Sequence, residues 1–244
     1  MKPSLSVIVP ALNEEPNLGS VIDNIKYAVE GNIGDYEILI FNDGSTDNTA
    51  KIADKIAQKD KHVKVIHNKK NRGIGYCFRK GVKLVDKEYV IFIPGDNELH
   101  KGSIKKLLGL IKMSNEDIII PYVVNKELRP IHRRLISELF TSTLNTLFNL
   151  RLKYYLGENI YKTNMIKKIN MTTNSFAYQA EILVKLLKSG HSYTEIETKM
   201  QKRTGKSKMF KIKNIVGVIK TVFTLVLEIY FLNKELYHKN KIDR

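Results

Sequence analysis

The first 125 residues alternate between short apolar runs and longer segments with helical periodicity. We predict strands where β-branched and other apolar residues cluster, at 5–9, 36–41, 63–66, 89–93 and 118–123. Between them, apolar side chains recur every three or four residues, which indicates helices at 21–29, 50–57, 75–85 and 103–113. Asp47 can cap the second of these helices. Strands that alternate with helices of about 10–15 residues predict βαβ units and a mostly parallel sheet.

The rest of the chain is less regular. Helical periodicity predicts helices at 130–150 and 176–187, and we expect a strand at 192–197. The last pattern is an apolar helix at 215–232, with the small and polar residues Gly217, Lys220, Thr221, Thr224 and Glu228 close to one stripe. The sequence therefore predicts an α/β protein with a helix-flanked sheet and an amphipathic C-terminal helix.

The length and composition fit one large α/β domain, or one domain plus an appendage, in a reducing compartment. The chain has 244 residues, of which 43% are hydrophobic, so it can bury a sizeable core. Its one cysteine, Cys77, excludes an intrachain disulfide and disfavours a zinc site built on cysteines. We expect no signal peptide, because the first apolar run holds a proline and continues into Asn13, Glu14 and Glu15.

The net charge is +16, and it is concentrated at the C-terminal end. The segment 199–244 carries +9 of it, and residues 199–213 hold seven bases and no acid. Such a block points to an anionic partner, either ligand phosphates, a lipid surface or nucleic acid, although a solvated basic tail would look the same. We expect no nucleic-acid partner, because the basic run lacks interleaved aromatics and the chain shows no nucleic-acid-binding motif.

Polar residues follow the predicted strands, where an open parallel sheet binds its ligands. Residues 13–15 follow the first strand, 42–47 the second and 94–98 the fourth, and each of these segments holds at least one carboxylate. Turns and helix caps use the same residue types, but clustered carboxylates repel unless a cation or donor compensates. The chain has no P-loop and no Gly-x-Ser-x-Gly elbow, and Gly73-Ile74-Gly75 is only a fragment of a dinucleotide-binding motif.

The strings at 7–15 (Val-Ile-Val-Pro-Ala-Leu-Asn-Glu-Glu), 42–49 (Asn-Asp-Gly-Ser-Thr-Asp-Asn-Thr) and 71–75 (Asn-Arg-Gly-Ile-Gly) resemble the start of a family 2 glycosyltransferase. That resemblance implies the GT-A fold, a mostly parallel Rossmann-like sheet flanked by helices. Residues 203–208 (Arg-Thr-Gly-Lys-Ser-Lys) look like the late Arg-x-x-Gly-x-Ser-Lys segment of the dolichol-phosphate mannosyltransferase-like branch. Arg133 and Ser137 are placed like the Arg-x-x-x-Ser of that branch.

The resemblance implies a nucleotide-sugar donor, linked to UDP or GDP. Asp43 would accept a hydrogen bond from the imide of the base, and Glu14 or Glu15 would meet the ribose hydroxyls. An ionised carboxylate suits both tasks because it only accepts hydrogen bonds. The other residues implied at the donor site are Pro10, Asn13, Ser45, Asp47, Arg72 and Gly73.

The end of the fourth strand is the metal site of the resembled family, which usually reads Asp-x-Asp. Here the triplet is Pro94-Gly95-Asp96, followed by Glu98. Two carboxylates two residues apart in a turn can face one ion, and Mg²⁺ often takes one or two carboxylates together with phosphates and water. We therefore expect Asp96 and Glu98 to bind Mg²⁺ or Mn²⁺, with Asp96 taking part in catalysis.

The arginines and lysines of the second half would handle phosphates. Arg203, Lys206, Ser207 and Lys208 would close over the leaving diphosphate, whose charge cations stabilise. Arg129, Arg133, Arg134 and Ser137 would hold an acceptor phosphate, with Arg133 and Arg203 in catalytic roles. The acceptor-side segment Tyr154-Tyr155-Leu156-Gly157 replaces the Asp-containing Ser-Gly segment of the mannosyltransferase branch.

These features favour a polyprenyl-phosphate-type acceptor. A phosphate monoester is already ionised and needs only positioning, whereas the alternative acceptor, a saccharide hydroxyl, needs a general base. A nucleotidyltransferase on a similar sheet is a further alternative, and it would release pyrophosphate. The net charge of +16 also leaves a basic nucleic-acid-binding protein as an alternative of a different class. The expected enzyme is an inverting, metal-dependent glycosyltransferase.

The C-terminal helix has three interpretations: it lies in a membrane interface, it packs on this domain or on a second copy, or it spans a membrane. Spanning is the least favourable, because Lys220 and Glu228 lie within it. We expect a GT-A domain at 1–210, with a nucleotide-binding half at 1–125 and an acceptor half with the basic loop at 126–210, and a membrane-associating or packing tail at 211–244. The expected location is peripheral, on the cytoplasmic face of the membrane.

Overall fold

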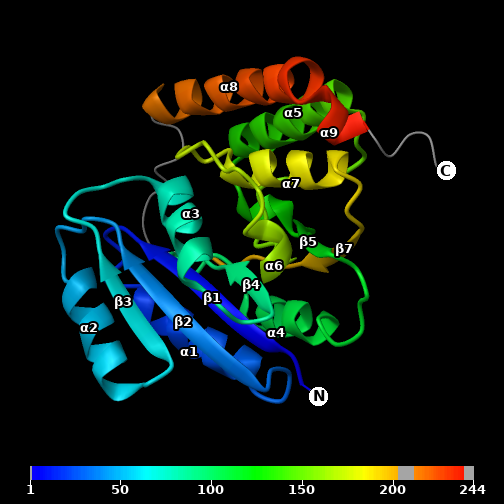
Figure 1. Cartoon of the computed structure of the whole chain (residues 1–244). Helices are drawn as coiled ribbons and strands as arrows, with labels where there is room; N and C mark the ends of the chain where they lie inside the picture. The colour runs from blue at the N-terminus through cyan, green and yellow to red at the C-terminus, as the bar shows by residue number, and fades with distance from the viewer. Residues whose placement is uncertain (1, 203–211, 239–244) are drawn as a thin grey trace.

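A mixed sheet organises the computed structural model, which describes residues 2–202 and 212–238. Within these residues the sheet has seven strands in the order β3-β2-β1-β4-β6-β5-β7 (Figure 1). Neighbouring strands run parallel except at β6, which pairs antiparallel with both β4 and β5. The strands are β1 (Ser4–Ala11), β2 (Asp35–Asn42), β3 (Val63–His67), β4 (Tyr89–Phe92), β5 (Ile118–Val123), β6 (Ile160–Lys162) and β7 (Tyr193–Thr198).

Helices cover both faces of the sheet. The first half contributes α1 (Leu18–Val29), α2 (Thr49–Lys59), α3 (Ile74–Leu84) and α4 (Lys101–Leu110). The second half contributes a 3₁₀ turn (Lys126–Leu128), α5 (Ile131–Phe148), α6 (Thr163–Ile166), α7 (Tyr178–Lys188), α8 (Ile212–Leu227), the π-helical turn η2 (Glu228–Leu232) and α9 (Lys234–His238).

Alternation along the strands builds two hydrophobic clusters, one on each face of the sheet. In β1, Val7 and Val9 pack with residues of α1 and α4, whereas Ile8 between them packs with residues of α3 and α7. Successive side chains of a strand point to opposite faces, so a strand covered on both faces reads as a continuous apolar run. This explains why the first strand of the sequence shows no polar alternation.

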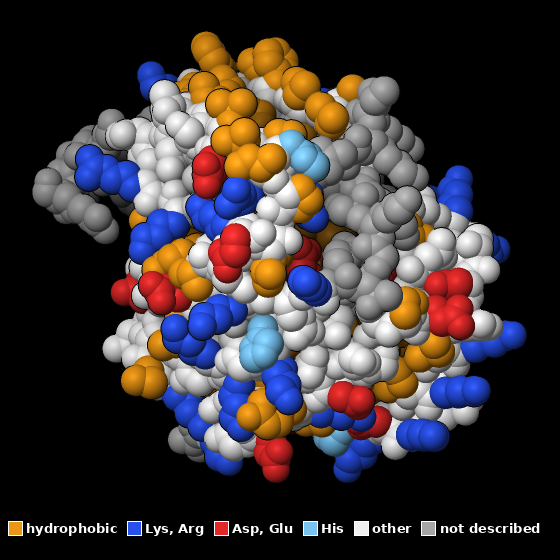
Figure 2. Space-filling model, turned by 180° about the vertical axis from the view of Figure 1, so that it is seen from behind, with side chains coloured by type: hydrophobic (Ala, Val, Ile, Leu, Met, Phe, Trp, Pro, Cys, Tyr) orange, Lys and Arg blue, Asp and Glu red, His pale blue; other side chains and the backbone are white. Residues whose placement is uncertain are grey.

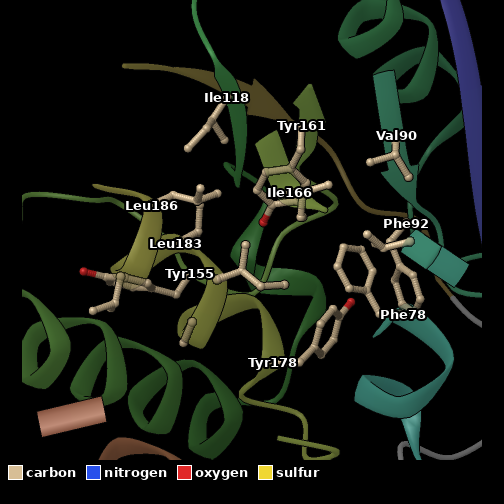
Figure 3. Packing of buried hydrophobic residues seen from close by; sticks show 14 of the residues in the cluster. Phe78, Val90, Phe92, Ile118, Tyr155, Tyr161, Ile166, Tyr178, Leu183 and Leu186 are labelled. Atoms are coloured by element: carbon tan, nitrogen blue, oxygen red, sulfur yellow. The ribbon is translucent and has the colours of Figure 1, made fainter. Parts of the chain in front are cut away.

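The cluster on the α3 and α7 side extends to the C-terminal helix. Phe78 of α3, Phe92 of β4 and Tyr178 of α7 pack ring against ring, with centroids 5.2 Å apart in each pair (Figure 3). Leu225 of α8 and Ile229 of η2 are almost fully buried in the same cluster. The C-terminal helix is therefore part of the hydrophobic core of this domain.

The predicted α/β fold with a mostly parallel sheet and an apolar C-terminal helix is confirmed. The prediction missed β6, which has only three residues, and with it the antiparallel pairings at the centre of the sheet. The prediction for the α2 cap was close but not correct: Asn48 occupies the N-cap position, and the carboxylate of Asp47 accepts from the Thr49 backbone N–H at 3.0 Å. Arg203, Lys206, Ser207 and Lys208 lie outside the described residues.

Candidate active site at the carboxyl ends of the strands

A cavity of about 1050 Å³ opens where β1, β2 and β4 end. The residues that follow these strands line it, among them Glu14, Asp43 and Asp96. Arg129, Arg133, the segment 172–176 and residues of α8 line it as well. Its position is the one at which open α/β sheets bind ligands.

Asp43 organises the loop that covers the end of β2. Its carboxylate accepts from the side-chain amide of Asn68 at 2.8 Å and from the backbone N–H groups of Arg72 and Gly73, both at 2.9 Å. Burial and a side-chain hydrogen bond to Asp43 raise the pKa of the Cys77 thiol, so this thiol is a fourth donor to a carboxylate with about four acceptor positions, and a donor from a ligand would compete with these groups. Asp43 is almost fully buried, yet it lines the cavity, so a ligand donor can reach it.

The next turn of this loop requires glycine at position 73. Gly73 has a φ of +95°, and a Cβ placed on it would lie 2.8 Å from the carbonyl oxygen of Asn174. Only glycine combines this backbone conformation with so close an approach. The loop after β3 thus packs directly against the segment 172–176, and both line the cavity.

Four of the residues predicted at the donor site do not line the cavity: Asn13, Glu15, Ser45 and Asp47. Instead, they form hydrogen bonds between the loop that follows β1 and the loop that follows β2. The Asn13 side chain accepts from the Thr46 N–H at 2.8 Å, and the Asn13 N–H donates to Ser45 Oγ at 3.0 Å. Glu15 accepts from the Asn48 N–H at 3.0 Å, while its own N–H donates to Asp47. These residues tie the ends of β1 and β2 together and thereby position Pro10, Glu14 and Asp43, which do line the cavity.

Three carboxylates line the cavity near the end of β4: Asp96, Glu98 and Glu158. Asp96 accepts from the Glu98 N–H at 3.2 Å, and the Glu98 carboxylate pairs with Arg129 Nε at 3.3 Å. Burial, together with the negative charges of Glu98 and Asp96, raises the pKa of Glu158 to about 7. The sequence analysis missed Glu158, which precedes the short strand β6 and belongs to no recognisable motif.

The arginines predicted to hold an acceptor phosphate separate in the structure. Arg129 and Arg133 line the cavity, whereas Arg134 and Ser137 do not, and Nε of Arg134 is buried without a hydrogen-bond partner. Arg129 Nη1 donates to the Tyr154 hydroxyl at 2.9 Å. Burial by itself lowers the pKa of Arg129, but the neighbouring Tyr154 and Glu98 raise it above its usual value, so the guanidinium stays charged.

The part of the cavity lining that α8 contributes was not predicted as part of the site. Gly217, Thr221 and Thr224 of α8 line it together with the segment 172–176. Thr221 Oγ1 lies 2.7 Å from Thr173 Oγ1 and 3.1 Å from Ser175 Oγ, so hydroxyl hydrogen bonds join the helix to the segment. The polar stripe of the C-terminal helix was visible in the sequence, but nothing in the sequence indicated what it faces.

A sequence profile for glycosyl transferase family 2 matches residues 6–182. The chain belongs to this family. The prediction that this chain is a family 2 glycosyltransferase, and therefore an enzyme, is confirmed at the level of the family.

Relatives agree with this membership. An uncharacterised protein of Methanocaldococcus jannaschii is 29% identical over 90% of this chain and 97% of its own length. A dolichyl-phosphate beta-glucosyltransferase of Dictyostelium discoideum is 36% identical, over 38% of this chain and 30% of that protein. A cholesterol galactosyltransferase of Borreliella burgdorferi is 33% identical, over 48% of this chain and 32% of that protein. The alignments with these two named enzymes thus span about a third of their lengths.

Solved structures support the GT-A fold. Glucosyl-3-phosphoglycerate synthase from Mycobacterium tuberculosis, crystallised with Mn²⁺, UDP-glucose and phosphoglyceric acid, superimposes with a TM-score of 0.71. The match covers 92% of this chain and 80% of that one at 18% sequence identity. At this identity the likeness establishes the fold.

Replacement of Asp43 by alanine is expected to weaken nucleoside-diphosphate binding by about 100-fold or more and to lower the free energy of unfolding by ~2–4 kcal/mol. Both effects follow from the two backbone N–H groups and the amide that lose a charged acceptor. Calorimetric titration with UDP and urea unfolding measure them. Asp47→Ala is the control, because Asp47 bonds within the neighbouring loops but does not line the cavity. Equal losses of UDP affinity in both variants would contradict a direct role for Asp43.

Glu158 should make the metal-free protein less stable as the pH rises. Its pKa of about 7 in the folded state lies above the ordinary glutamate value, so the folded state binds more protons in the interval between them. Its contribution to stability is therefore lost as the pH increases from about 5 to 8. In a chelating buffer, Glu158→Gln is expected to be more stable than the wild type at pH 8, by ~1–3 kcal/mol, and nearly equal at pH 5. Urea unfolding at both pH values tests this, with Glu138→Gln on the exposed surface as the control.

Proposed function

We propose that this enzyme transfers a sugar from a nucleoside-diphosphate sugar, with inversion, to the phosphate of a polyprenyl-phosphate-type lipid. The observation that carries this proposal is that one cavity joins the carboxylates at the end of β4 to the arginines Arg129 and Arg133. The carboxylates suit a metal-bound diphosphate, and the arginines beside them suit a second phosphate. A UDP-linked donor is favoured over a GDP-linked one, because the M. tuberculosis synthase is crystallised with UDP-glucose.

The residues at the end of β4 fit a divalent cation. Asp96 and Glu98 offer only oxygen donors, which Mg²⁺ and Mn²⁺ prefer. In the described part of the chain, no group of three or more acidic, histidine or cysteine side chains forms a complete metal site. Asp96 and Glu98 would therefore hold an ion that also binds the donor diphosphate. When bound, the ion neutralises charge on the leaving group.

The acceptor proposal rests on Arg129 and Arg133, which line the wall of the cavity beside Glu98. Arg129 is held by Glu98 and Tyr154, so its guanidinium is oriented before any ligand binds. Arg133 lines the same wall from the first turn of α5. A phosphate held here needs no general base, because its oxygen is already the nucleophile. The D. discoideum relative is named for a dolichyl-phosphate acceptor, which supports a lipid phosphate.

The remaining predicted roles stay proposals. Arg203, Lys206, Ser207 and Lys208 would close over the diphosphate as in the mannosyltransferase branch, and the tail from 211 onward would associate with the cytoplasmic face of the membrane. Arg134 and Ser137 would act on the acceptor only if α5 shifts, since neither lines the cavity. We also propose a nucleotide-binding half at 1–125, an acceptor half that includes the basic loop at 126–210, and a tail at 211–244.

A saccharide hydroxyl is the second candidate acceptor, and Glu158 is the observation that favours it. A carboxylate with a pKa of about 7 inside the cavity suits a general base working near neutral pH. The two candidates differ in what Glu158→Gln does. It should leave transfer to a phosphate nearly unchanged and should abolish transfer to a hydroxyl.

The deciding experiment offers the full chain UDP- and GDP-sugars with Mg²⁺, together with a short-chain polyprenyl phosphate, the corresponding polyprenol or an oligosaccharide. Release of nucleoside diphosphate and formation of glycosylated product are measured together. We expect product from the polyprenyl phosphate and none from the polyprenol. Product from the oligosaccharide alone would overturn the lipid-phosphate proposal, and release of pyrophosphate would indicate a nucleotidyltransferase.

A further inference from the structure

Two neighbouring helices present apolar side chains to the outside. On α5, Ile131, Leu135 and Leu139 recur every four residues and are all more than half exposed. On α8, Val216, Ile219 and Phe223 are spaced by three and four residues and are also more than half exposed, with Ile219 and Phe223 each 64% exposed. We call these six residues the α5–α8 face. Hydrophobic side chains gather at this end of the molecule in Figure 2, where Figure 1 shows α5 and α8 next to each other.

The two helices are fixed to each other, so the face is a single surface. The Tyr230 hydroxyl in η2 donates to the carbonyl oxygen of Leu147 in α5 at 2.6 Å. The Tyr230 ring also stacks on Phe148, with centroids 6.1 Å apart. Soluble monomers rarely leave so many large apolar side chains exposed on adjacent elements without a partner.

We propose that the α5–α8 face is the surface by which this protein docks in the plane of an anionic lipid bilayer. The proposal deepens the proposed function, on which it rests for its choice of a lipid partner. Charge supports that partner. Seven bases and no acid occupy residues 199–213, immediately before and into α8, and Lys239, Lys241 and Arg244 follow α9. A bilayer with anionic headgroups attracts such segments, whereas a second copy would bring together two chains of charge +16.

The position of the cavity favours the same partner. The inner side of α8, with Gly217, Thr221 and Thr224, lines the cavity, while its outer side forms the α5–α8 face. One helix thus separates the candidate active site from the docking surface. A bilayer on the outer side would place headgroups next to the cavity, which is where a lipid-linked phosphate has to enter.

The structure favours docking in the plane over spanning. Among the described residues, the stretch Asn214–Leu232 is long and apolar enough to cross a membrane, with a mean hydropathy of 2.0. However, Leu225 and Ile229 of this stretch are buried in the domain core, and Glu228 pairs with the buried Lys185 at 2.9 Å. Spanning would break these contacts, whereas docking leaves them intact.

Co-sedimentation of the full chain with vesicles tests the proposal. We compare vesicles of phosphatidylcholine alone with vesicles that also contain phosphatidylglycerol, at low and high salt. Two double variants, Leu135→Asp with Leu139→Asp and Ile219→Asp with Phe223→Asp, are each expected to reduce binding to anionic vesicles by about tenfold or more. Matched controls are Leu84→Asp and Met113→Asp, which replace exposed apolar residues elsewhere and should change binding less than about twofold.

A fluorescence measurement keeps the test independent of the aspartate variants. The chain has no tryptophan, so Phe223→Trp introduces a single reporter on the face, and Met113→Trp introduces one away from it. With vesicles, the first should shift to shorter wavelength and be quenched by brominated lipid, and the second should not. Thermal unfolding and UDP titration of each variant show whether the fold and the donor site are preserved.

Three results would overturn the proposal. The first is wild-type protein that stays in the supernatant at every lipid concentration, and the second is equal vesicle binding by the wild type and either double variant. The third is a solution dimer that the aspartate variants dissociate, together with a Phe223→Trp reporter that brominated lipid does not quench. The last result would assign the face to a second copy. None of these readouts depends on sugar transfer, so failure of the acceptor assay leaves the docking result unaffected, and the reverse also holds.

Discussion

Asp96→Asn is expected to reduce sugar transfer by about 1000-fold while leaving the fold unchanged. Asp96 lines the cavity directly after β4 and is one of the two carboxylates proposed to hold the divalent ion. The amide keeps the shape of the side chain but removes the negative charge that binds the cation, and with it the stabilisation of the leaving diphosphate. Steady-state kinetics with saturating donor and Mn²⁺ measure the loss, and calorimetric titration with Mn²⁺ and UDP measures the ion independently of turnover.

Two further variants test whether Asp96 acts by binding the metal or only through its negative charge. Glu98→Gln should cost less, about tenfold, because the Glu98 carboxylate is already paired with Arg129. Asp117→Asn should have no effect on transfer, since Asp117 precedes β5 at the opposite end of the sheet and pairs with Lys162 and His191. Undiminished transfer by the wild type in excess chelator would show that the enzyme does not use a metal.

The sheet could be predicted because its strands carry their own signal. Strands β1, β2 and β4 are buried on both faces, so each appears as a short run of β-branched and aliphatic residues followed by a turn. Strand β6 could not be found in this way. It has three residues, and its place between β4 and β5 is fixed by pairing with strands about 40 and 70 residues earlier in the chain, which a local pattern does not contain.

The candidate site was predictable to the extent that strand ends define it. Asp43, Asp96 and Glu98 follow strands, and the rule that ligands bind at the carboxyl ends brings them to the cavity. The same rule selected Asn13 and Glu15, which bond to the neighbouring loop instead, because a motif does not show which of its polar side chains face the ligand and which hold the loops. Glu158 and the wall formed by α8 depend on long-range packing, so the sequence alone did not reveal them.

The packing of α8 attaches the C-terminal helix to the rest of the domain through buried charges as well as apolar contacts. Lys185 of α7 is only 1% exposed and pairs with two carboxylates, Glu181 at 3.0 Å and Glu228 at 2.9 Å. Glu181 also accepts from the backbone N–H groups of Thr172 and Thr173, in the segment that lines the cavity. One buried cation therefore links α7 and the C-terminal helix, and through Glu181 the cavity wall.

Lys185→Met is accordingly expected to lower the free energy of unfolding by ~3–5 kcal/mol, because two poorly solvated carboxylates lose their shared cation. It should also weaken UDP binding, since the segment 172–176 packs against the loop that Asp43 holds. Urea unfolding and UDP titration measure the two effects. Lys188→Met, one turn further along α7 and partly exposed, is the matched control and should cost less than about 1 kcal/mol.

The double variant Lys185→Met with Glu228→Gln distinguishes a charge effect from a packing effect. Removing the second charge should restore part of the lost stability, because one of the two uncompensated carboxylates is then neutral.

If Lys185→Met is as stable as Lys188→Met, the buried pairs do not hold the C-terminal helix to the domain. A chain ended at Asn214 would then be expected to fold. If instead the wild type depends on these pairs, the shortened chain lacks Leu225, Ile229 and Glu228, the partner of Lys185. We then expect it to unfold and not to yield a soluble donor-binding domain.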